Sequence, residues 1–218
     1  MPSSGLDLSG YSAGFQREFE EKMRAREKAL GAARSAIRSS ANAIRAIHRA
    51  EFDQAHELMD QARASLAAGK SAVREAHPDV YFAGFLEDAQ KEYTEARLTE
   101  ALVTGEELPS REELDVELAA FLNGMAESIG EGRRAILDLL RQGDVERCER
   151  ILAAMEDMYH LLVSMDYPDA ITRNLRRSTD AARGIMERTR GDLTIALVQR
   201  KLQLALERHV DELRDGAS

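Results

Sequence analysis

The chain has 218 residues, a formal net charge of −9 and 44% hydrophobic residues, which is enough for one domain with a sizeable core. It contains no run of 18 apolar residues that would predict a transmembrane helix, and its one cysteine, Cys148, excludes both an intrachain disulfide and a multi-cysteine zinc site. The acidic balance argues against a nucleic-acid partner, unless the basic residues gather on one surface.

Residues 1–9 contain Pro, Gly and Ser and predict a flexible tail, without the basic start or apolar stretch of a signal peptide. We therefore expect a cytoplasmic protein in which residues 10–218 form a single domain. The first predicted helix runs from about Tyr11 to Ala50. Apolar residues recur in it every seven positions, with Ala33 and Ile47 between them, which is typical of a coiled-coil seam: Met23, Leu30, Ile37 and Ile44.

Four arginines share one face of this first helix at spacings of 4, 7 and 4: Arg34, Arg38, Arg45 and Arg49. Guanidinium groups suit phosphate oxygens, so these residues are candidates for nucleic-acid binding. Pairing with the abundant glutamates on a solvated face explains them equally well, and both interpretations stay open. Solvated ion pairs are preferred for a later cluster: Arg173, Arg176, Arg177 and Arg183.

Six more helices follow with short connections, separated by Pro, Gly and capping signals. They are predicted at 51–76, from the acidic stretch to Gly105, from the Ser110–Glu113 capping box to Arg141, at 144–164, at 169–188 and at 192–213. No alternating strand of useful length occurs. The predicted fold class is therefore all-α, with about seven helices in a single bundle-like domain.

The third predicted helix contains the most informative stretch, Asp88 to Ala96. Asp88, Glu92 and Glu95 are spaced i, i+4, i+7 and share one stripe beside the apolar face. Glu127 and Glu131, spaced i, i+4, form a matching pair on the fourth helix. Two acidic stripes on neighbouring helices could hold a hard divalent cation. Because the chain has 39 acidic residues, however, spacing alone favours solvated glutamates.

Two geometric questions bear on a shared site. A straight antiparallel hairpin would leave the two glutamate pairs about 13 Å apart in height, at a rise of about 1.5 Å per residue. Convergence therefore requires an irregular segment after Ser110 or a crossing angle. Gly124 and Ser128 lie on the same side of the fourth helix as Glu127 and Glu131, and such small residues admit either another helix or a ligand.

Three stretches resemble the translin and translin-associated factor X (TRAX) family. The opening of the first helix, Phe15-Gln-Arg-Glu-Phe-Glu-Glu-Lys-Met-Arg-Ala-Arg-Glu-Lys, resembles the start of TRAX. Glu92-Tyr-Thr-Glu95-Ala96 is similar to its Glu-Tyr-Val-Glu-Ala stretch. Leu122-Asn-Gly-Met-Ala-Glu127-Ser-Ile-Gly-Glu131 is similar to its Leu-Leu-Gly-Val-Ala-Asp-Leu-Thr-Gly-Glu stretch. The resemblance covers roughly residues 15–190.

This resemblance implies a helical protein that forms closed, barrel-like octamers around single-stranded RNA or DNA. It implies catalytic, Mg²⁺-binding roles for Glu92, Glu95 and Glu127, with Glu131 as a further ligand and Mn²⁺ as a possible substitute ion. Glu127 stands where the family motif has Asp, which lengthens that ligand by one methylene. The expected function is a Mg²⁺-dependent endoribonuclease acting on single-stranded RNA, as a homo-octamer with no membrane partner. The alternative is a non-catalytic single-stranded RNA- or DNA-binding or scaffold oligomer.

Overall fold

The computed structural model describes residues 9–215, and all regular structure within them is helical. The long helices are α1 (Ser9–His48), α2 (Phe52–Val73), α4 (Phe85–Thr104), α6 (Leu118–Gln142), α7 (Val145–Val163) and α9 (Leu175–Asp215). Three short helices connect them: α3 (Pro78–Tyr81), α5 (Arg111–Leu114) and α8 (Asp169–Thr172). The predicted all-α fold class is confirmed. The predicted tail lies outside the described residues, apart from Ser9.

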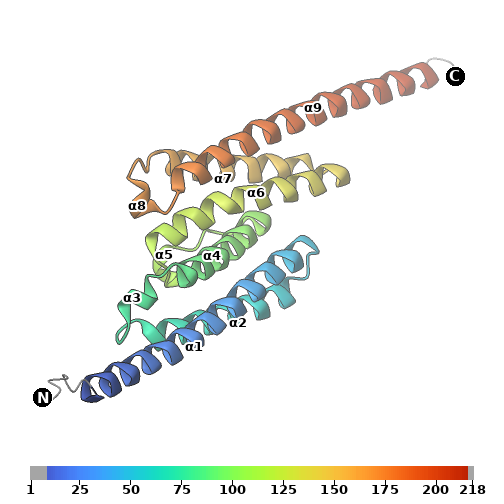
Figure 1. Ribbon diagram of the computed structural model, residues 1–218. Helices are drawn as coiled ribbons and strands as arrows, with labels where there is room; N and C mark the ends of the chain where they lie inside the picture. Colours follow the sequence, from blue (N-terminus) through green and yellow to red (C-terminus); the bar gives the residue numbers. More distant parts are fainter. Residues whose placement is uncertain (1–8, 216–218) are drawn as a thin grey trace, which may run out of the picture.

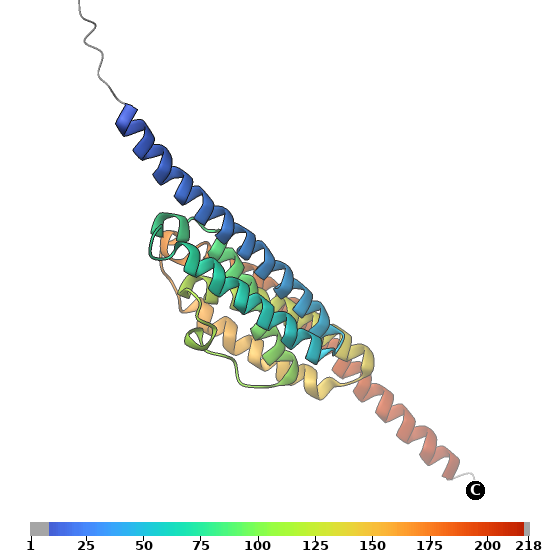
Figure 2. The ribbon, with the colours of Figure 1, turned by 90° about the horizontal axis from the view of Figure 1, so that it is seen from below.

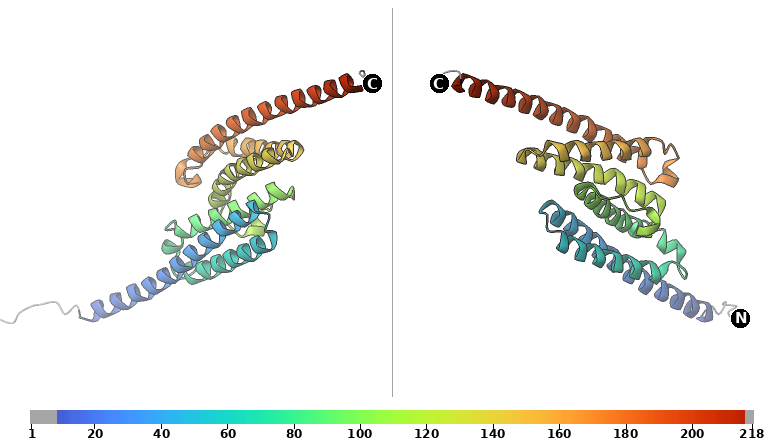
Figure 3. Two further views of the ribbon diagram at one scale, coloured as in Figure 1. Left: turned by 90° about the vertical axis from the view of Figure 1, so that its right-hand side faces the viewer. Right: turned by 180° about the vertical axis from the view of Figure 1, so that it is seen from behind.

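The helices stack in three layers, as Figure 1 shows: α1 with α2, then α4 with α6, then α7 with α9. One core cluster is built from α1, α2 and α4, and a second from the end of α4 with α6, α7 and α9. Figure 3 shows the same order from two further directions. The contact between α4 and α6 therefore lies in the middle of the molecule.

The long first and last helices extend beyond the bundle at opposite ends (Figure 2). Ala33, Ile44 and Ile47 of the predicted seam are buried in the first core cluster, whereas Met23 is 58% exposed. Only the second half of the seam is therefore buried within the chain. None of the described helices is apolar over a length that could cross a membrane.

The helix predicted from Ser110 to Arg141 is interrupted. The capping box of Ser110 and Glu113 is present, but it starts only the short helix α5. Asp115 then adopts a left-handed conformation with φ of 49°, and α6 begins at Leu118. This irregular segment is what the convergence of the two acidic pairs requires, since it shifts the start of α6 relative to the end of α4.

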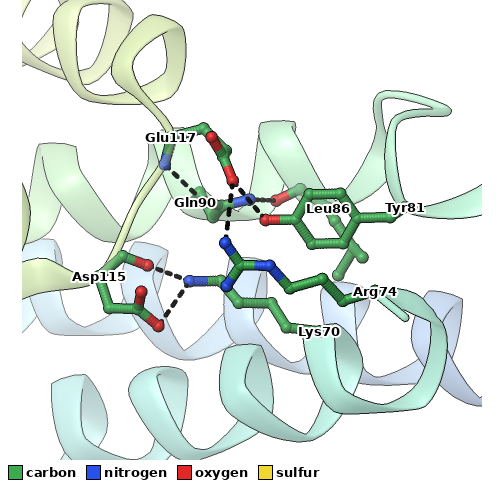
Figure 4. A network of polar contacts seen from close by, with 7 residues as sticks. All are labelled: Lys70, Arg74, Tyr81, Leu86, Gln90, Asp115 and Glu117. Atoms are coloured by element: carbon green, nitrogen blue, oxygen red, sulfur yellow. Dashed lines mark hydrogen bonds and ion pairs between the residues drawn. The ribbon is translucent and has the colours of Figure 1, made fainter. Parts of the chain in front are cut away.

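A network of polar contacts holds this segment in place (Figure 4). Lys70 of α2 donates to the carbonyl of Asp115 and lies 3.1 Å from its carboxylate. Tyr81 donates to the carboxylate of Glu117 at 2.6 Å, and the Glu117 amide donates to Gln90 Oε1 at 2.8 Å. Because α2, α3 and α4 all contribute a partner, the offset between α4 and α6 is built into the fold.

The predicted break at Gly191-Asp192 is wrong, because α9 continues through it. A glycine inside a helix costs only about 1 kcal/mol relative to alanine, so neighbouring contacts can outweigh it. Here Leu193 is buried in the second core cluster, and Asp192 pairs with Arg133 of α6 at 2.8 Å.

The preceding helix, predicted from about Asp169 to Arg188, is also divided. The four-residue α8 ends where Arg173 and Asn174 adopt left-handed conformations, with φ of 53° and 65°. The chain reverses there, and α9 begins at Leu175. This turn brings Arg173 against Glu87 of α4, with a distance of 3.1 Å between their charged groups.

Candidate metal and nucleic-acid site

The backbones of α4 and α6 touch at Gly124. A Cβ atom there would lie 2.7 Å from the carbonyl oxygen of Lys91 and 2.7 Å from Thr94 Cβ, so no side chain fits. Ser128, one turn later, is completely buried and donates to the carbonyl of Met125 at 2.9 Å. The small-residue side of α6 therefore receives another helix, and Glu127 lies at the edge of that contact.

This close approach brings three carboxylates together. Glu92 and Glu95 of α4 and Glu127 of α6 each offer one oxygen, and these three oxygens lie within 4.8 Å of one another. All three residues are partly buried. Oxygen donors that leave room for water are what Mg²⁺ prefers, so this carboxylate triad (Glu92, Glu95 and Glu127) fits a hard divalent cation.

The electrostatics of the carboxylate triad favour binding a cation. Burial, followed by repulsion from Glu127, Glu92 and Glu131, raises the pKa of Glu95 to about 8. Burial and the charge of Glu127 also raise the pKa of Glu92, against the opposing effect of Lys91. Partly buried like charges are costly, and a bound cation would relieve that cost.

Lys91 supplies a positive charge from the chain itself. Its Nζ lies 2.7 Å from Glu127 Oε1 and 3.4 Å from Glu92 Oε1. Burial lowers the pKa of Lys91, but the hydrogen bonds and charges of Glu127 and Glu92 outweigh this effect, and the pKa is raised. Lys91 therefore stays charged between two of the three carboxylates.

Glu131, the fourth predicted ligand, does not join the carboxylate triad. His48, at the end of α1, contacts its carboxylate at 2.5 Å, and Arg134 lies 3.6 Å from it. The hydrogen bond with His48 lowers the pKa of Glu131 despite partial burial. Glu131 is one turn away from Glu127, but its carboxylate already has these two side chains as partners.

The four predicted nucleic-acid-binding arginines of α1 are all exposed, but they differ in their partners. Arg45 donates to Asn42 at 2.7 Å, and Arg49 donates twice to Glu51, at 2.8 and 2.6 Å. Within residues 9–215, Arg34 and Arg38 have no ion pair and no hydrogen-bond partner for their side chains. These two are therefore the most available for phosphate.

Two surface hollows meet at Glu127. One is lined by Lys91, Asn123 and Arg173, and the other by Glu95 and Arg177. Arg173 and Arg176 form ion pairs with Glu87 and Asp166, each at 3.1 Å, in agreement with the preferred interpretation of that cluster. Arg177 differs, because it faces the hollow beside Glu95, where a phosphate could approach the carboxylate triad.

Comparison with known proteins bears on this arrangement. No protein-family model matches the chain. An uncharacterised protein of Methanocaldococcus jannaschii is 33% identical over 191 residues, which cover 84% of this chain and 81% of that protein. The crystal structure of AfC3PO and the structure of its complex with duplex RNA are both 34% identical to this chain. Each covers 87% of this chain and 98% of its own, with a TM-score of 0.79.

The chain belongs to the translin/TRAX family. The structure of apo-NeC3PO, 19% identical with a TM-score of 0.71 over 89% of this chain and 99% of its own, shares the fold. Where the TRAX motif has Asp, this family member has Glu127. The longer side chain still reaches Glu92 and Glu95, since its oxygen lies within 4.8 Å of theirs.

Three residues near the predicted ligands of this translin/TRAX-family protein were not assigned to the site from the sequence: Lys91 and Arg177 beside the carboxylate triad, and His48 beside Glu131. Lys91 precedes Glu92 directly, so its place beside the acidic stripe was readable. His48 and Arg177 carried no such signal, because they reach the site from α1 and α9 through tertiary packing. Neither the partner of Glu131 nor the arginine beside Glu95 follows from spacing along one helix.

Proposed function

We propose that this translin/TRAX-family protein is an endoribonuclease that cleaves single-stranded RNA with a divalent cation, Mg²⁺ or its substitute Mn²⁺. The observation that carries the proposal is the carboxylate triad, in which α4 and α6 bring three oxygen donors within 4.8 Å of one another. AfC3PO has been solved in a complex with duplex RNA, which supports RNA as the ligand of this family member, whereas the preference for a single strand rests on the family resemblance.

The residues have distinct tasks in this proposal. Glu92, Glu95 and Glu127 would hold the cation, which when bound supplies Lewis-acid chemistry at the phosphate. Arg177 lines the hollow beside Glu95 and would orient the phosphate there through its guanidinium. Hydrolysis consumes one water for each P–O bond broken and leaves one hydroxyl end and one phosphate end.

The nucleic acid would bind inside a closed homo-oligomer, an octamer by the family resemblance. We propose that Arg34, Arg38, Arg45 and Arg49 form a phosphate-binding face on α1, led by Arg34 and Arg38. All four residues are exposed. Basic residues lining an enclosed space would let a chain with a net charge of −9 bind RNA or single-stranded DNA.

The test is cleavage of an end-labelled single-stranded RNA, and of the same sequence as a duplex, with Mg²⁺, with Mn²⁺ and with EDTA. We expect cleavage of the single strand that EDTA abolishes and that Glu95→Gln lowers by at least about a hundredfold, within the range that general positioning and charge effects supply. Glu112→Gln is the matched control, since Glu112 is an exposed glutamate on α5. Cleavage that survives in EDTA or in Glu95→Gln would overturn the mechanism.

A second candidate function is a non-catalytic RNA-binding oligomer. The contact of Lys91 with Glu92 and Glu127 favours it, because an ammonium group balances part of the acidic charge without any metal. RNA binding with no cleavage under any of the metal conditions would establish this alternative.

A further inference from the structure

Lys91 is the only cation of the described residues that is paired with the carboxylate triad. Its Nζ lies between the carboxylates of two helices, 2.7 Å from Glu127 and 3.4 Å from Glu92. Glu95 has no ion pair in the described part of the chain. The lysine side chain is only 25% exposed, so the charge is held in a partly shielded place.

The charge balance around Lys91 limits what else can bind. With a cation bound, the three carboxylates would be ionised and carry three negative charges, of which the ammonium offsets one. The two that remain match one divalent cation. A second ion, about 4 Å from the first as in two-metal sites, would have to share Glu92 or Glu127 with the ammonium group and would be repelled by it.

The two surface hollows that meet at Glu127 separate Lys91 from Glu95. Glu95 lines the hollow on one side and Lys91 lines the hollow on the other. A cation on the Glu95 side would therefore have Lys91 across Glu127 from it. An ammonium group has three donors, so Lys91 can contact both carboxylates and still donate to a phosphate oxygen.

We infer that the carboxylate triad takes a single divalent cation, on the Glu95 side, and that Lys91 supplies the second positive charge against the substrate phosphate. The inference rests on the proposed function, because it concerns the same site. It assigns to Lys91 the place that a second metal ion occupies in two-metal nucleases.

The test counts bound ions by the decrease of the free Mn²⁺ signal in electron paramagnetic resonance. We expect one Mn²⁺ per chain in the unaltered protein and in Lys91→Arg. Lys91→Met keeps the unbranched side chain but removes the charge, so its affinity for Mn²⁺ should rise by at least about tenfold while RNA cleavage falls by a similar factor. Lys22→Met is the control, because Lys22 pairs with Asp79 at 2.7 Å on the surface.

Each outcome separates this inference from the proposed function. Two ions in the unaltered protein, or unchanged Mn²⁺ affinity in Lys91→Met, would overturn the role of Lys91 while leaving a metal nuclease. Unchanged cleavage in Lys91→Met would remove its contact with the substrate. If no Mn²⁺ binds at all, or if Glu95→Gln binds it as well as the unaltered protein, the proposed function fails instead.

Discussion

Glu95 is the residue whose ionisation is most affected by its surroundings. Its pKa is raised from an ordinary value of 4.5 to about 8, first by burial and then by the charges of neighbouring glutamates. In the unfolded chain the carboxyl group loses its proton near pH 4.5, and in the metal-free folded chain near pH 8. Between these values the folded state still holds a proton that the unfolded state has lost, so the contribution of Glu95 to the stability of the folded protein falls as the pH rises and levels off above pH 8.

The fall in stability with rising pH leads to a first prediction. Metal-free Glu95→Gln cannot ionise, so it should gain stability over the unaltered protein as the pH rises from about 5 to 8, by about 1–2 kcal/mol once partial exposure is allowed for. Urea unfolding across that range measures the effect. In the control Glu112→Gln no such gain is expected, because the hydrogen bond from Arg111 lowers the pKa of Glu112. Parallel stability curves for Glu95→Gln and the unaltered protein would contradict the prediction.

The partners of the α1 arginines lead to a second prediction. Changing both Arg34 and Arg38 to Ala should weaken binding of single-stranded oligonucleotides of any sequence. It should also reduce the slope of log affinity against log salt by about 0.7 to 1 unit for each phosphate that is no longer neutralised. Arg49→Ala should have a smaller effect, since Glu51 already occupies its guanidinium. Filter binding at several salt concentrations measures both quantities.

The control for this titration is Arg63→Ala on α2, where the exposed guanidinium pairs with Asp60 at 2.9 Å. Its affinity and salt slope should match those of the unaltered protein. If the double variant behaves in the same way as Arg63→Ala, Arg34 and Arg38 are ordinary surface charges.

At the scale of helices, the contact between α4 and α6 depends on one missing side chain. Gly124→Ala would place a Cβ atom 2.7 Å from the carbonyl oxygen of Lys91, and backbone cannot yield as a side-chain tip can. We predict that stability falls by at least about 2 kcal/mol, measured by urea unfolding, and that Mn²⁺ binding weakens, because the two helices must separate.

The matched control lies on the same helix. At Gly130 an added Cβ would meet only Ile185 Cδ1, at 3.7 Å, which is ordinary contact. Gly130→Ala should therefore leave Mn²⁺ binding unchanged and stabilise the protein by about 0.5–1 kcal/mol through helix propensity. Equal effects of the two substitutions would show that the close approach at Gly124 is unimportant.

The helices themselves were largely predictable from the sequence, whereas the points at which one helix breaks or continues into the next were not. Periodicity and the capping signals at Ser110, Gly105 and Gly143 give the all-α fold and most helix ends. The break at Asp115 and the continuity through Gly191 depend on Lys70 and on the burial of Leu193, which come from other helices. Local patterns contain no information on such tertiary partners. The sequence therefore predicted a continuous helix through Asp115 and a break at Gly191, and both predictions were wrong.

The candidate site divides in the same way. Glu92 and Glu95 were placed together by spacing alone, because they belong to one helix. Their distance from Glu127 depends on the irregular segment that precedes α6. The sequence showed that such a segment or a crossing angle is needed for convergence, but not that it is present. The pairing of Glu131 with His48 could not be predicted from the sequence, since α1 and α6 are far apart along the chain.

At the scale of the whole molecule, the projecting helix ends carry exposed apolar side chains. On α1 these are Tyr11, Phe15, Phe19 and Met23, each at least 58% exposed, and the described end of α9 exposes another series: Ile195, Val198, Leu202, Leu206, Val210 and Leu213. Such rows are typical of surfaces buried in an assembly.

We therefore predict a mass well above the 24.3 kDa of one chain in light scattering, corresponding to an octamer by the family resemblance. Phe15→Glu combined with Phe19→Glu should lower the mass, because charges would replace the apolar contact. Phe82→Glu, at another exposed aromatic residue, is the control and should leave the mass unchanged. A monomeric mass for the unaltered protein would contradict the prediction.

The start of α1 and the end of α9 project at opposite ends of the bundle, which has a consequence for symmetry (Figure 2). A chain that associated through one end only, in a two-fold contact, would stop at a dimer, whereas association through two ends that point apart would give each subunit two neighbours. If each end pairs with the same end of another copy, every contact is a two-fold one and the two kinds alternate around the assembly. Under that pairing, any closed ring of this chain would contain an even number of subunits.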